Sequence, residues 1–286
     1  MTPSAMKVAY QGARGAYSEG AAAALFPALE PVPQRAFADV FSALGSGRVR
    51  AAVVPVENTL AGSVVDVYDL LREHEDIRVL GEYVMRIRHC LIGLRGAILD
   101  EVRIARSHPV ALAQVDEYLQ AHGIRPEIAY DTAGAAEEVA RIGDPIVAAV
   151  AGKGAAETYG LAVLAEGIET LPHNYTRFFA IARRDDDEIA RSLAPLSGPV
   201  KTSLVYVTKN VPGALVRSLQ PFATAGIQLT KIESRPSRAA AWDYVFYLDF
   251  EGDPAESPAR EALALMRTCC EWITVLGTYR SSRSES

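Results

Sequence analysis

Residues 51–56 read Ala-Ala-Val-Val-Pro-Val, a short apolar run that lies between Arg50 and the polar stretch Glu57–Ser63. Its length and its content of β-branched residues are typical of a buried strand. Three other segments in the first two-thirds of the chain have the same character: Val8–Gln11, Arg103–Ala105 and Ile146–Val150. We therefore expect these four segments to be strands.

Ala-rich or amphipathic segments separate the expected strands. They are Glu19–Leu25, Val64–Arg72, Ala111–Ala121 and Ala135–Ile142. Their composition favours helices. Strands that alternate with helices predict parallel, doubly wound sheets, so the first two-thirds of the chain is expected to be α/β.

The stretch 183–199 changes character, because a run of charged residues is followed by Pro195, Ser197, Gly198 and Pro199. This composition is typical of a linker and places a domain boundary near residue 200. The remainder predicts strands, a turn around Ser234–Ser237 and two helices. In chain order the elements are strand Thr202–Thr208, helix Pro212–Ala225, strands Ile227–Ile232 and Trp242–Phe250, helix Pro258–Trp272 and strand Ile273–Tyr279. The order βαββαβ is that of the ferredoxin-like unit.

Composition excludes several classes of function. A net charge of -6 argues against nonspecific binding to nucleic acid, which needs dense Lys and Arg. No apolar run approaches membrane-spanning length, and the N-terminus lacks the pattern of a signal peptide. Cys90, Cys269 and Cys270 form no CxxC motif, so free thiols are expected. We expect a cytoplasmic protein with neither a nucleic acid nor a membrane as partner.

Motifs for cofactors and metals are also lacking. Gly152-Lys153-Gly154 resembles the end of a phosphate-binding loop, but Val147 stands where that loop needs its first glycine. The five histidines show no spacing typical of zinc ligands. The sequence therefore predicts a site without cofactor or metal.

Small polar residues gather where expected strands give way to expected helices. Four such junctions are Gly15–Ser18, Asn58–Ser63, Ser107–Pro109 and Asp131–Gly134. In open α/β sheets these junctions lie at the carboxyl ends of strands, where ligands bind. Helix N-termini suit carboxylates, although each polar residue taken alone is better explained as a helix cap than as a ligand. The four together favour a cleft for a small anion.

Six motifs, in order, resemble those of prephenate dehydratases. In the first part they are Gly12–Ser18, Val54–Thr59 with Gly62, Ser107-His108-Pro109 with Ala113-Gln114, and Asn174-Tyr175-Thr176-Arg177-Phe178. In the last part, Pro212–Leu215 and Glu233–Pro236 resemble the two phenylalanine-binding motifs of the ACT domain of this family. The resemblance runs from about Lys7 to Tyr279.

The resemblance implies a catalytic domain at residues 6–184, built of two α/β subdomains like a type II periplasmic binding protein. The first subdomain would comprise residues 6–84 and 176–184, and the second residues 85–175. A linker at 185–200 would lead to a ferredoxin-like ACT regulatory domain at 201–280. The chain would cross between the subdomains near Gly81–Arg86 and return near Thr176–Ile181, with the active cleft between them.

The implied activity is that of a hydro-lyase. Prephenate would lose CO2 and its ring hydroxyl to give phenylpyruvate for L-phenylalanine synthesis, without cofactor or metal. Thr176 is the implied catalytic residue at the leaving hydroxyl. The implied substrate-binding residues are Asn58, Thr59, Ser63, Ser107, Gln114 and Arg177. Alternation along a regular strand would point Thr176 and Arg177 to opposite faces, so Arg177 either clamps a carboxylate or serves a structural ion pair.

The resemblance also implies feedback regulation by phenylalanine and a homodimer or homotetramer. The implied effector-binding residues are Gly213, Ala214, Leu215, Glu233, Ser234, Arg235 and Pro236. Two alternatives stay open on the sequence alone. One is arogenate dehydratase, which performs the same elimination on the transaminated substrate. The other is a non-enzymatic amino-acid-sensing protein with a solute-binding fold.

Overall fold

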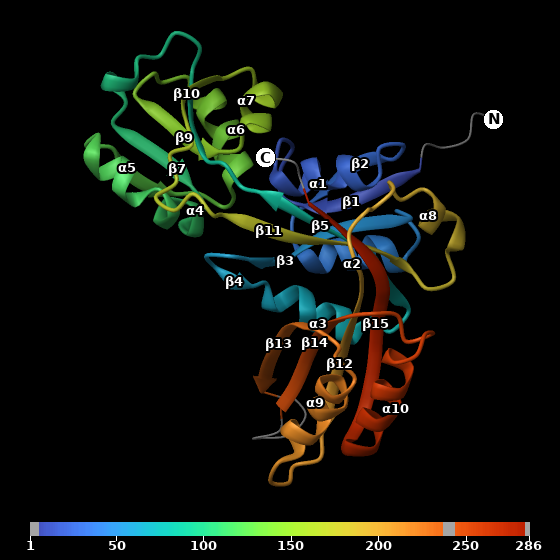
Figure 1. Cartoon of the computed structure of the whole chain (residues 1–286). Helices are drawn as coiled ribbons and strands as arrows, with labels where there is room; N and C mark the ends of the chain where they lie inside the picture. Colours follow the sequence, from blue (N-terminus) through green and yellow to red (C-terminus); the bar gives the residue numbers. More distant parts are fainter. Residues whose placement is uncertain (1–5, 237–243, 284–286) are drawn as a thin grey trace, which may run out of the picture.

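The computed structural model of the protein describes residues 6–236 and 244–283. Figure 1 shows a small lobe formed by the middle of the chain, a central sheet, and a C-terminal part on the opposite side of that sheet. The chain therefore has three parts in space.

Two strands of the central sheet, β1 (Lys7–Gln11) and β3 (Ala51–Asn58), match expected apolar runs. Its order is β5-β11-β3-β1-β2, and β4 pairs with the end of β3. The strands are β1 (Lys7–Gln11), β2 (Glu30–Gln34), β3 (Ala51–Asn58), β4 (Gly62–Ser63), β5 (Ile77–Arg86) and β11 (Tyr175–Arg183). Helices α1 (Tyr17–Leu25), α2 (Phe37–Gly45) and α3 (Val65–Glu73) pack on this sheet.

The small lobe carries a second sheet, in the order β10-β6-β9-β7-β8. Its strands are β6 (Cys90–Gly93), β7 (Ile104–Ser107), β8 (Arg125–Ile128), β9 (Val147–Ala151) and β10 (Ala162–Glu166). Its helices are the 3-10 turn η1 (Leu99–Glu101), α4 (Pro109–Gln114), α5 (Asp116–Ala121), α6 (Thr132–Ile142) and α7 (Lys153–Tyr159).

Two long strands, β5 and β11, carry the chain out to the small lobe and back (Figure 1). Because β11 returns the chain, it runs antiparallel to both β5 and β3. The central sheet is consequently mixed. The small-lobe sheet is mixed because β6 runs antiparallel to β9 and β10. The expectation of parallel sheets is therefore wrong. The parallel pairs remain where helices connect the strands, as between β1 and β3 or between β7 and β9.

The C-terminal part has the predicted βαββαβ order. Its elements are β12 (Val200–Thr208), α9 (Ala214–Thr224), β13 (Leu229–Pro236), β14 (Tyr244–Glu251), α10 (Ala259–Cys269) and β15 (Cys270–Arg283). The strand order β13-β14-β12-β15 is antiparallel throughout. The predicted fold class, two α/β subdomains followed by a ferredoxin-like unit, is confirmed.

Two local predictions differ from the structure. The predicted linker contains helix α8 (Asp187–Arg191), because Asp186 caps the helix at the backbone N–H of Ile189 and the Ile189 side chain is buried. The predicted turn at Ser234 is instead strand, since residues up to Pro236 pair with β14. The predicted strand residue Trp242 and the turn residue Ser237 lie outside the described residues.

Strand β15 joins the C-terminal sheet to the central sheet. Its residues Arg280–Arg283 pair in parallel with Gly81–Val84 of β5. The strands β15 and β5 approach closely at Gly277, where an added Cβ would overlap the carbonyl oxygen of Val79. Glycine allows this contact because it has no side chain.

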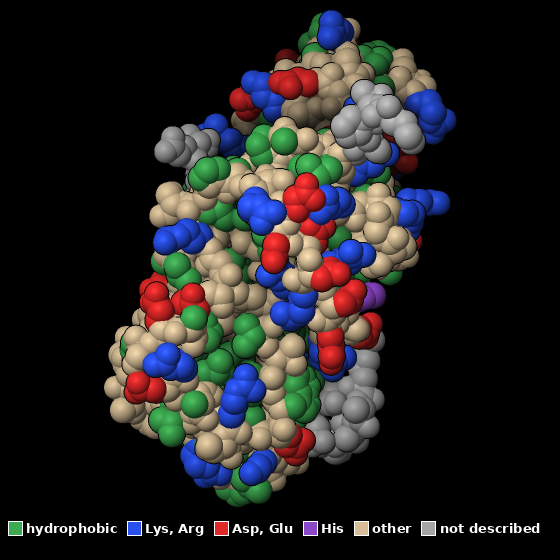
Figure 2. Space-filling model, turned by 90° about the vertical axis from the view of Figure 1, so that its right-hand side faces the viewer, with side chains coloured by type: hydrophobic (Ala, Val, Ile, Leu, Met, Phe, Trp, Pro, Cys, Tyr) green, Lys and Arg blue, Asp and Glu red, His purple; other side chains and the backbone are tan. Residues whose placement is uncertain are grey.

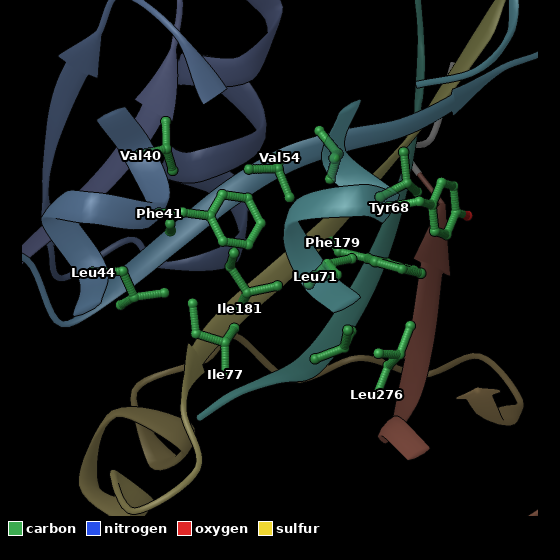
Figure 3. Packing of buried hydrophobic residues seen from close by; sticks show 14 of the residues in the cluster. Val40, Phe41, Leu44, Val54, Tyr68, Leu71, Ile77, Phe179, Ile181 and Leu276 are labelled. Carbon is green, nitrogen blue, oxygen red and sulfur yellow. The ribbon is translucent and has the colours of Figure 1, made fainter. Parts of the chain in front are cut away.

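One hydrophobic core spans the central sheet and the C-terminal sheet. Figure 3 shows Phe41, Phe179 and Tyr68 from the first part of the chain in one cluster with Leu276 of β15. Tyr247 of β14 belongs to this cluster, with its ring centroid 4.9 Å from that of Tyr68. Removal of the C-terminal part would expose this shared core to water, so the two parts depend on each other for stability.

Candidate active site

A cavity of about 550 Å³ lies between the central sheet and the small lobe. All four predicted strand-to-helix junctions contribute to its wall. Their contributions are Tyr17 and Ser18, then Asn58 and Ala61–Ser63, then His108, and finally Asp131 and Thr132. The other polar residues of the lining are Thr176, Gln114, His89, Gln11 and Tyr130. The carboxyl ends of strands from both sheets thus meet at one cleft, as the sequence predicted.

Asn58, the last residue of β3, has a fixed amide orientation. Its Oδ1 accepts hydrogen bonds from the backbone N–H groups of Leu60 and Ala61, at 3.0 and 2.9 Å. Since Oδ1 faces two donors, Nδ2 must be the atom on the other side of the amide. This Nδ2 lies 3.0 Å from Oγ1 of Thr176 and donates to it. The backbone of one loop thereby determines which group faces Thr176.

Thr176 is the second residue of β11 and lies at the floor of the cleft with 9% of its surface exposed. Its hydroxyl oxygen accepts the N–H of Asn58, so its own proton is not needed for that bond. The hydroxyl is therefore available to donate to a ligand in the cleft.

Gln114 and Asn174 extend this polar group. Asn174 is fully buried, and its Oδ1 accepts from Asn58 Nδ2 at 2.7 Å. Its Nδ2 donates to Gln114 Oε1 at 3.0 Å. Asn174 lies within a motif that the sequence analysis quoted, yet its role in connecting the other two amides required the tertiary structure.

His89 was not among the predicted site residues. It follows the crossing strand β5, is buried, and lies with Nε2 2.7 Å from Gln114 Oε1. Burial lowers the pKa of His89, although its hydrogen bond to Gln114 acts in the opposite direction. A neutral ring is the result. A lone histidine after a strand gives no signal in the sequence that could have identified it.

Asp131 also belongs to the cleft and connects its two sides. Its carboxylate caps α6 at the backbone N–H of Gly134 and accepts the backbone N–H of Ala13, 3.1 Å away across the cleft. The neighbouring Tyr130 hydroxyl donates to the carbonyl of Arg35. The small lobe and the central sheet are thus held together at this end of the cleft.

Other predicted substrate-binding residues are placed differently. Ser107 is fully buried and donates to the carbonyl of Val150, and it does not line the cavity. Thr59 lies outside the lining and bonds to the backbone of His173 and Tyr175. Both side chains hold the backbone next to the cleft. Ser63 lines the cleft, but its hydroxyl also contacts Lys231 and Glu233 of β13.

Arg177 points away from the cleft into a buried cluster of charges. Its guanidinium contacts Glu57 and Glu82 at 2.7 Å and Asp249 at 2.6 Å. Burial alone would lower the pKa of Arg177, but the charges of Asp249 and Glu82 raise it well above its ordinary value. The pairing of β11 with β3 shifts register between Arg177 and Phe178. Of the two alternatives for Arg177, the structure shows the ion pair.

The charge cluster around Arg177 joins three strands of the first part to the C-terminal part. Lys201 of β12 pairs with Glu82 at 2.7 Å. Ser203 donates to Asp249, and its oxygen lies 2.6 Å from the Tyr279 hydroxyl. Each buried carboxylate therefore has a partner of opposite charge.

The two predicted effector motifs lie in different places. Gly213, Ala214 and Leu215 line a C-terminal cavity of about 320 Å³, together with Tyr244 and Phe246 of β14 and residues 208–211. Residues 233–236 do not line it. Glu233 instead faces Ser63 and Lys231. Burial alone would raise the pKa of Glu233, but the hydrogen bonds from Ser63 and Lys231 lower it below the ordinary value. Ser234 and Pro236 pair with Phe246 and Tyr244, next to the cavity wall.

The surface, the remaining polar clusters and the helices add three findings. On the face in Figure 2, basic and acidic side chains lie next to one another. Within residues 6–236 and 244–283, no three His, Cys, Asp or Glu side chains are grouped to hold a metal. In the same ranges no helix is long and apolar enough to span a bilayer.

The Arg177 cluster leads to a prediction about stability. Arg177→Met should lower the free energy of unfolding by about 3–5 kcal/mol, because Glu82 and Asp249 would stay buried without the guanidinium. Adding Asp249→Asn should recover part of the loss. The control Arg78→Met removes a pair with the exposed Asp187 and should cost less than about 1 kcal/mol in the same urea titration. Equal costs for the two arginines would contradict a structural role for Arg177.

The comparisons with known proteins agree with the geometry. The sequence model of the family described as prephenate dehydratase matches residues 8–186. A protein of Arabidopsis thaliana named arogenate dehydratase/prephenate dehydratase 2, chloroplastic, is 40% identical, and the match covers 96% of this chain and 73% of the relative. A bifunctional N-acyl-homoserine lactone acylase/prephenate dehydratase of Komagataeibacter europaeus is 37% identical, with 96% of each chain covered.

A solved structure is similar over nearly the whole chain. It is the prephenate dehydratase of Arthrobacter aurescens in complex with L-Phe, which is 27% identical and superposes with a TM-score of 0.85. The match covers 96% of this chain and 90% of that chain. The family match, the relatives and the cleft together lead to one conclusion: the chain belongs to the prephenate dehydratase family, the hydro-lyases that act on prephenate or arogenate in aromatic amino acid biosynthesis.

Proposed function

We propose that this chain converts prephenate to phenylpyruvate, with loss of CO2 and water, as a step toward L-phenylalanine. One observation supports the proposal above the others. The Thr176 hydroxyl lies at the cleft floor with its oxygen already bonded by the amide of Asn58. Its proton can therefore be given to a departing hydroxyl group.

The elimination needs little from the enzyme beyond position and one hydrogen bond. The carboxylate leaves as CO2 and its bonding electrons move into the ring, which expels hydroxide and becomes aromatic. A donor at the departing oxygen lowers the barrier, because negative charge develops there in the transition state. Threonine is too weak an acid to ionise fully, so Thr176 donates a hydrogen bond or relays a proton from water.

The carboxylates of the substrate would be bound by backbone groups. Among the described residues that line the cleft there is no Lys or Arg. First-turn or capping residues of four helices line it instead: Tyr17 and Ser18 of α1, Val64 before α3, His108 before α4, and Asp131 and Thr132 at α6. The starts of α1 and α3 have no side-chain cap, so their free N–H groups and positive dipole ends suit an anion. At α4 and α6 the His108 and Asp131 side chains already accept a backbone N–H.

Prephenate and arogenate differ in one group, a keto oxygen against an ammonium. The name of the Arabidopsis relative includes both activities, and the elimination at Thr176 is the same for both. We propose prephenate as the preferred substrate, and kcat/KM measured for the two compounds side by side tests the preference. The non-enzymatic alternative is set aside because the family consists of enzymes.

Substitution of Thr176 tests the catalytic assignment. Thr176→Val keeps the shape but removes the donor, so kcat should fall by roughly 10²–10⁴ with little change in KM. Thr176→Ser keeps the hydroxyl and should retain more activity. Phenylpyruvate formation measures both, and circular dichroism verifies the fold. A folded valine variant with near wild-type kcat would refute the role.

We further propose that residues 6–184 form the catalytic domain, with residues 201–280 as a regulatory domain that binds phenylalanine. The C-terminal cavity supports this, because Gly213 adopts a left-handed φ of 76° directly before α9 and exposes the start of that helix. Free N–H groups there suit a carboxylate, and Tyr244 and Phe246 offer aromatic surface. The relative from Arthrobacter aurescens was solved with L-Phe.

A physical connection supports regulation from this site. Strand β14 carries both cavity-lining residues and Asp249, which contacts Arg177 next to the catalytic threonine. Strand β13 carries Glu233, which contacts Ser63 in the cleft wall. Movement of the C-terminal sheet would therefore act on the cleft at two points.

Phenylalanine should inhibit the full chain by roughly 5–150-fold at saturation, since coupling between sites is typically about 1–3 kcal/mol. Gly213→Val should abolish phenylalanine binding in calorimetry, because valine is strained at positive φ and fills the helix start. The matched control is Gly226→Val, which has φ 68° but open space around it. Inhibition that survives Gly213→Val would place the effector elsewhere. Truncation is unsuitable as a test because it would break the shared core.

We propose that the protein is a homodimer or homotetramer that pairs through its C-terminal parts. Exposed apolar side chains gather around the C-terminal cavity and on the edge strand β13: Val211, Leu215, Val216, Ile232 and Tyr244. A patch of this kind favours self-association. Light scattering at assay concentration should give at least twice the mass of 30.8 kDa, and a single-chain mass would exclude the assembly.

The cytoplasmic location remains a prediction, and the Arabidopsis relative is named as chloroplastic.

A further inference from the structure

Among the described residues, His89 is the one histidine whose ring contacts the group of polar side chains formed by Asn58, Gln114, Asn174 and Thr176. Its residue is 2% exposed, and its Nδ1 is buried without a hydrogen-bond partner among the described residues. Its Nε2 lies 2.7 Å from Gln114 Oε1. The mechanism at Thr176 does not use this ring directly, so its role needs an explanation.

The protonation of His89 follows from a chain of amide orientations. The backbone N–H groups of Leu60 and Ala61 fix Asn58 with Oδ1 as acceptor and Nδ2 as donor. Asn58 Nδ2 then requires an acceptor on Asn174, so that Asn174 Nδ2 becomes the donor on its other side. Each amide in the chain thereby determines the orientation of the next.

The last amide, that of Gln114, determines which nitrogen of the His89 ring carries the proton. Asn174 Nδ2 donates to Gln114 Oε1, so this oxygen is an acceptor and cannot give a proton to His89. The nitrogen that faces it, Nε2, must therefore carry the hydrogen. The unpartnered Nδ1 fits a bare lone pair, which agrees with the lowered pKa of a buried imidazole. The ring is neutral in the Nε2–H tautomer.

From this chain we propose that His89 is a positioning residue for the elimination. Its Nε2–H holds Gln114, Gln114 holds Asn174, and Asn174 holds the amide of Asn58 that keeps the Thr176 hydroxyl turned toward the substrate. Without the ring, Gln114 can turn, and Asn174 loses the acceptor that holds its amide against Asn58. The backbone of Leu60 and Ala61 still sets which atom of Asn58 faces the threonine, but the position of that amide is no longer held from the other side. The inference rests on the proposed function of Thr176.

The main chain at His89 does not depend on its ring. The backbone N–H of His89 donates to Glu169 Oε2 at 3.0 Å, and its carbonyl accepts from Gly167 and Ile168. The ring meets Tyr17 edge-on at a centroid distance of 6.0 Å. Because these backbone bonds stay in place, the side chain can be exchanged without loss of the loop.

The kinetic experiment separates positioning from packing. In the full chain, His89→Leu should lower kcat by roughly 10-fold to 100-fold, as misplacement of a reacting group does, with KM within about 3-fold. His89→Gln keeps a donor near Nε2 and should restore at least half of the lost activity on a logarithmic scale. The matched control His74→Leu replaces a half-buried ring that packs on Phe41 away from the cleft, and should leave kcat unchanged.

A double variant tests the connection to Thr176. If His89 acts through the threonine, His89→Leu should cost no further activity in the Thr176→Val background. Independent, multiplicative losses would overturn the proposal, as would a His89→Leu variant with wild-type kcat.

A second readout does not need turnover. Nitrogen-15 NMR of the labelled imidazole in the free protein should show Nε2 protonated and Nδ1 bare. A ring protonated at Nδ1 would overturn the proposal even in an active enzyme. If the wild-type chain acted on neither prephenate nor arogenate, the proposed function would fail, while the tautomer would still be measurable on its own.

Discussion

The ion cluster around Arg177 is the interaction on which the rest of this structure depends. One guanidinium contacts carboxylates from β3, β5 and β14, namely Glu57, Glu82 and Asp249. These strands come from distant parts of the chain, and buried charges of this kind are stable only when all partners are present. Because Arg177 directly follows Thr176, the cluster also fixes the strand that carries the Thr176 hydroxyl.

The same cluster explains why the C-terminal part is inseparable from the catalytic part. It supplies Asp249 and Lys201 to the charges, and β15 extends the central sheet through its pairing with β5. Its inner sheet face packs into the core shown in Figure 3. A ligand that shifts the C-terminal sheet therefore works against strands of the cleft itself. A flexible tether would transmit no such shift.

Under the proposed function, the cleft separates two tasks that the substrate imposes. Helix starts offer backbone N–H groups for carboxylates, and none of the described lining residues is a lysine or arginine. The reacting end is served by neutral amides, whose directions derive from two backbone donors next to Asn58. Neutral groups with fixed directions suit a reaction that releases charge, because they need no reorganisation as the bond breaks.

The sequence by itself determined the α/β alternation, the C-terminal βαββαβ order and the four polar junctions, because these depend on local periodicity and capping. Its motifs also singled out Thr176, Asn58 and Gln114, and all three line the cleft. Tertiary structure decided what depends on non-local pairing. The mixed central sheet follows from the returning strand β11, and the ion pairs of Arg177 follow from three distant strands. The position of His89 follows from its contact with Gln114. Hydrogen bonds and charges between residues far apart in the chain leave no periodic signal, so only the folded molecule shows them.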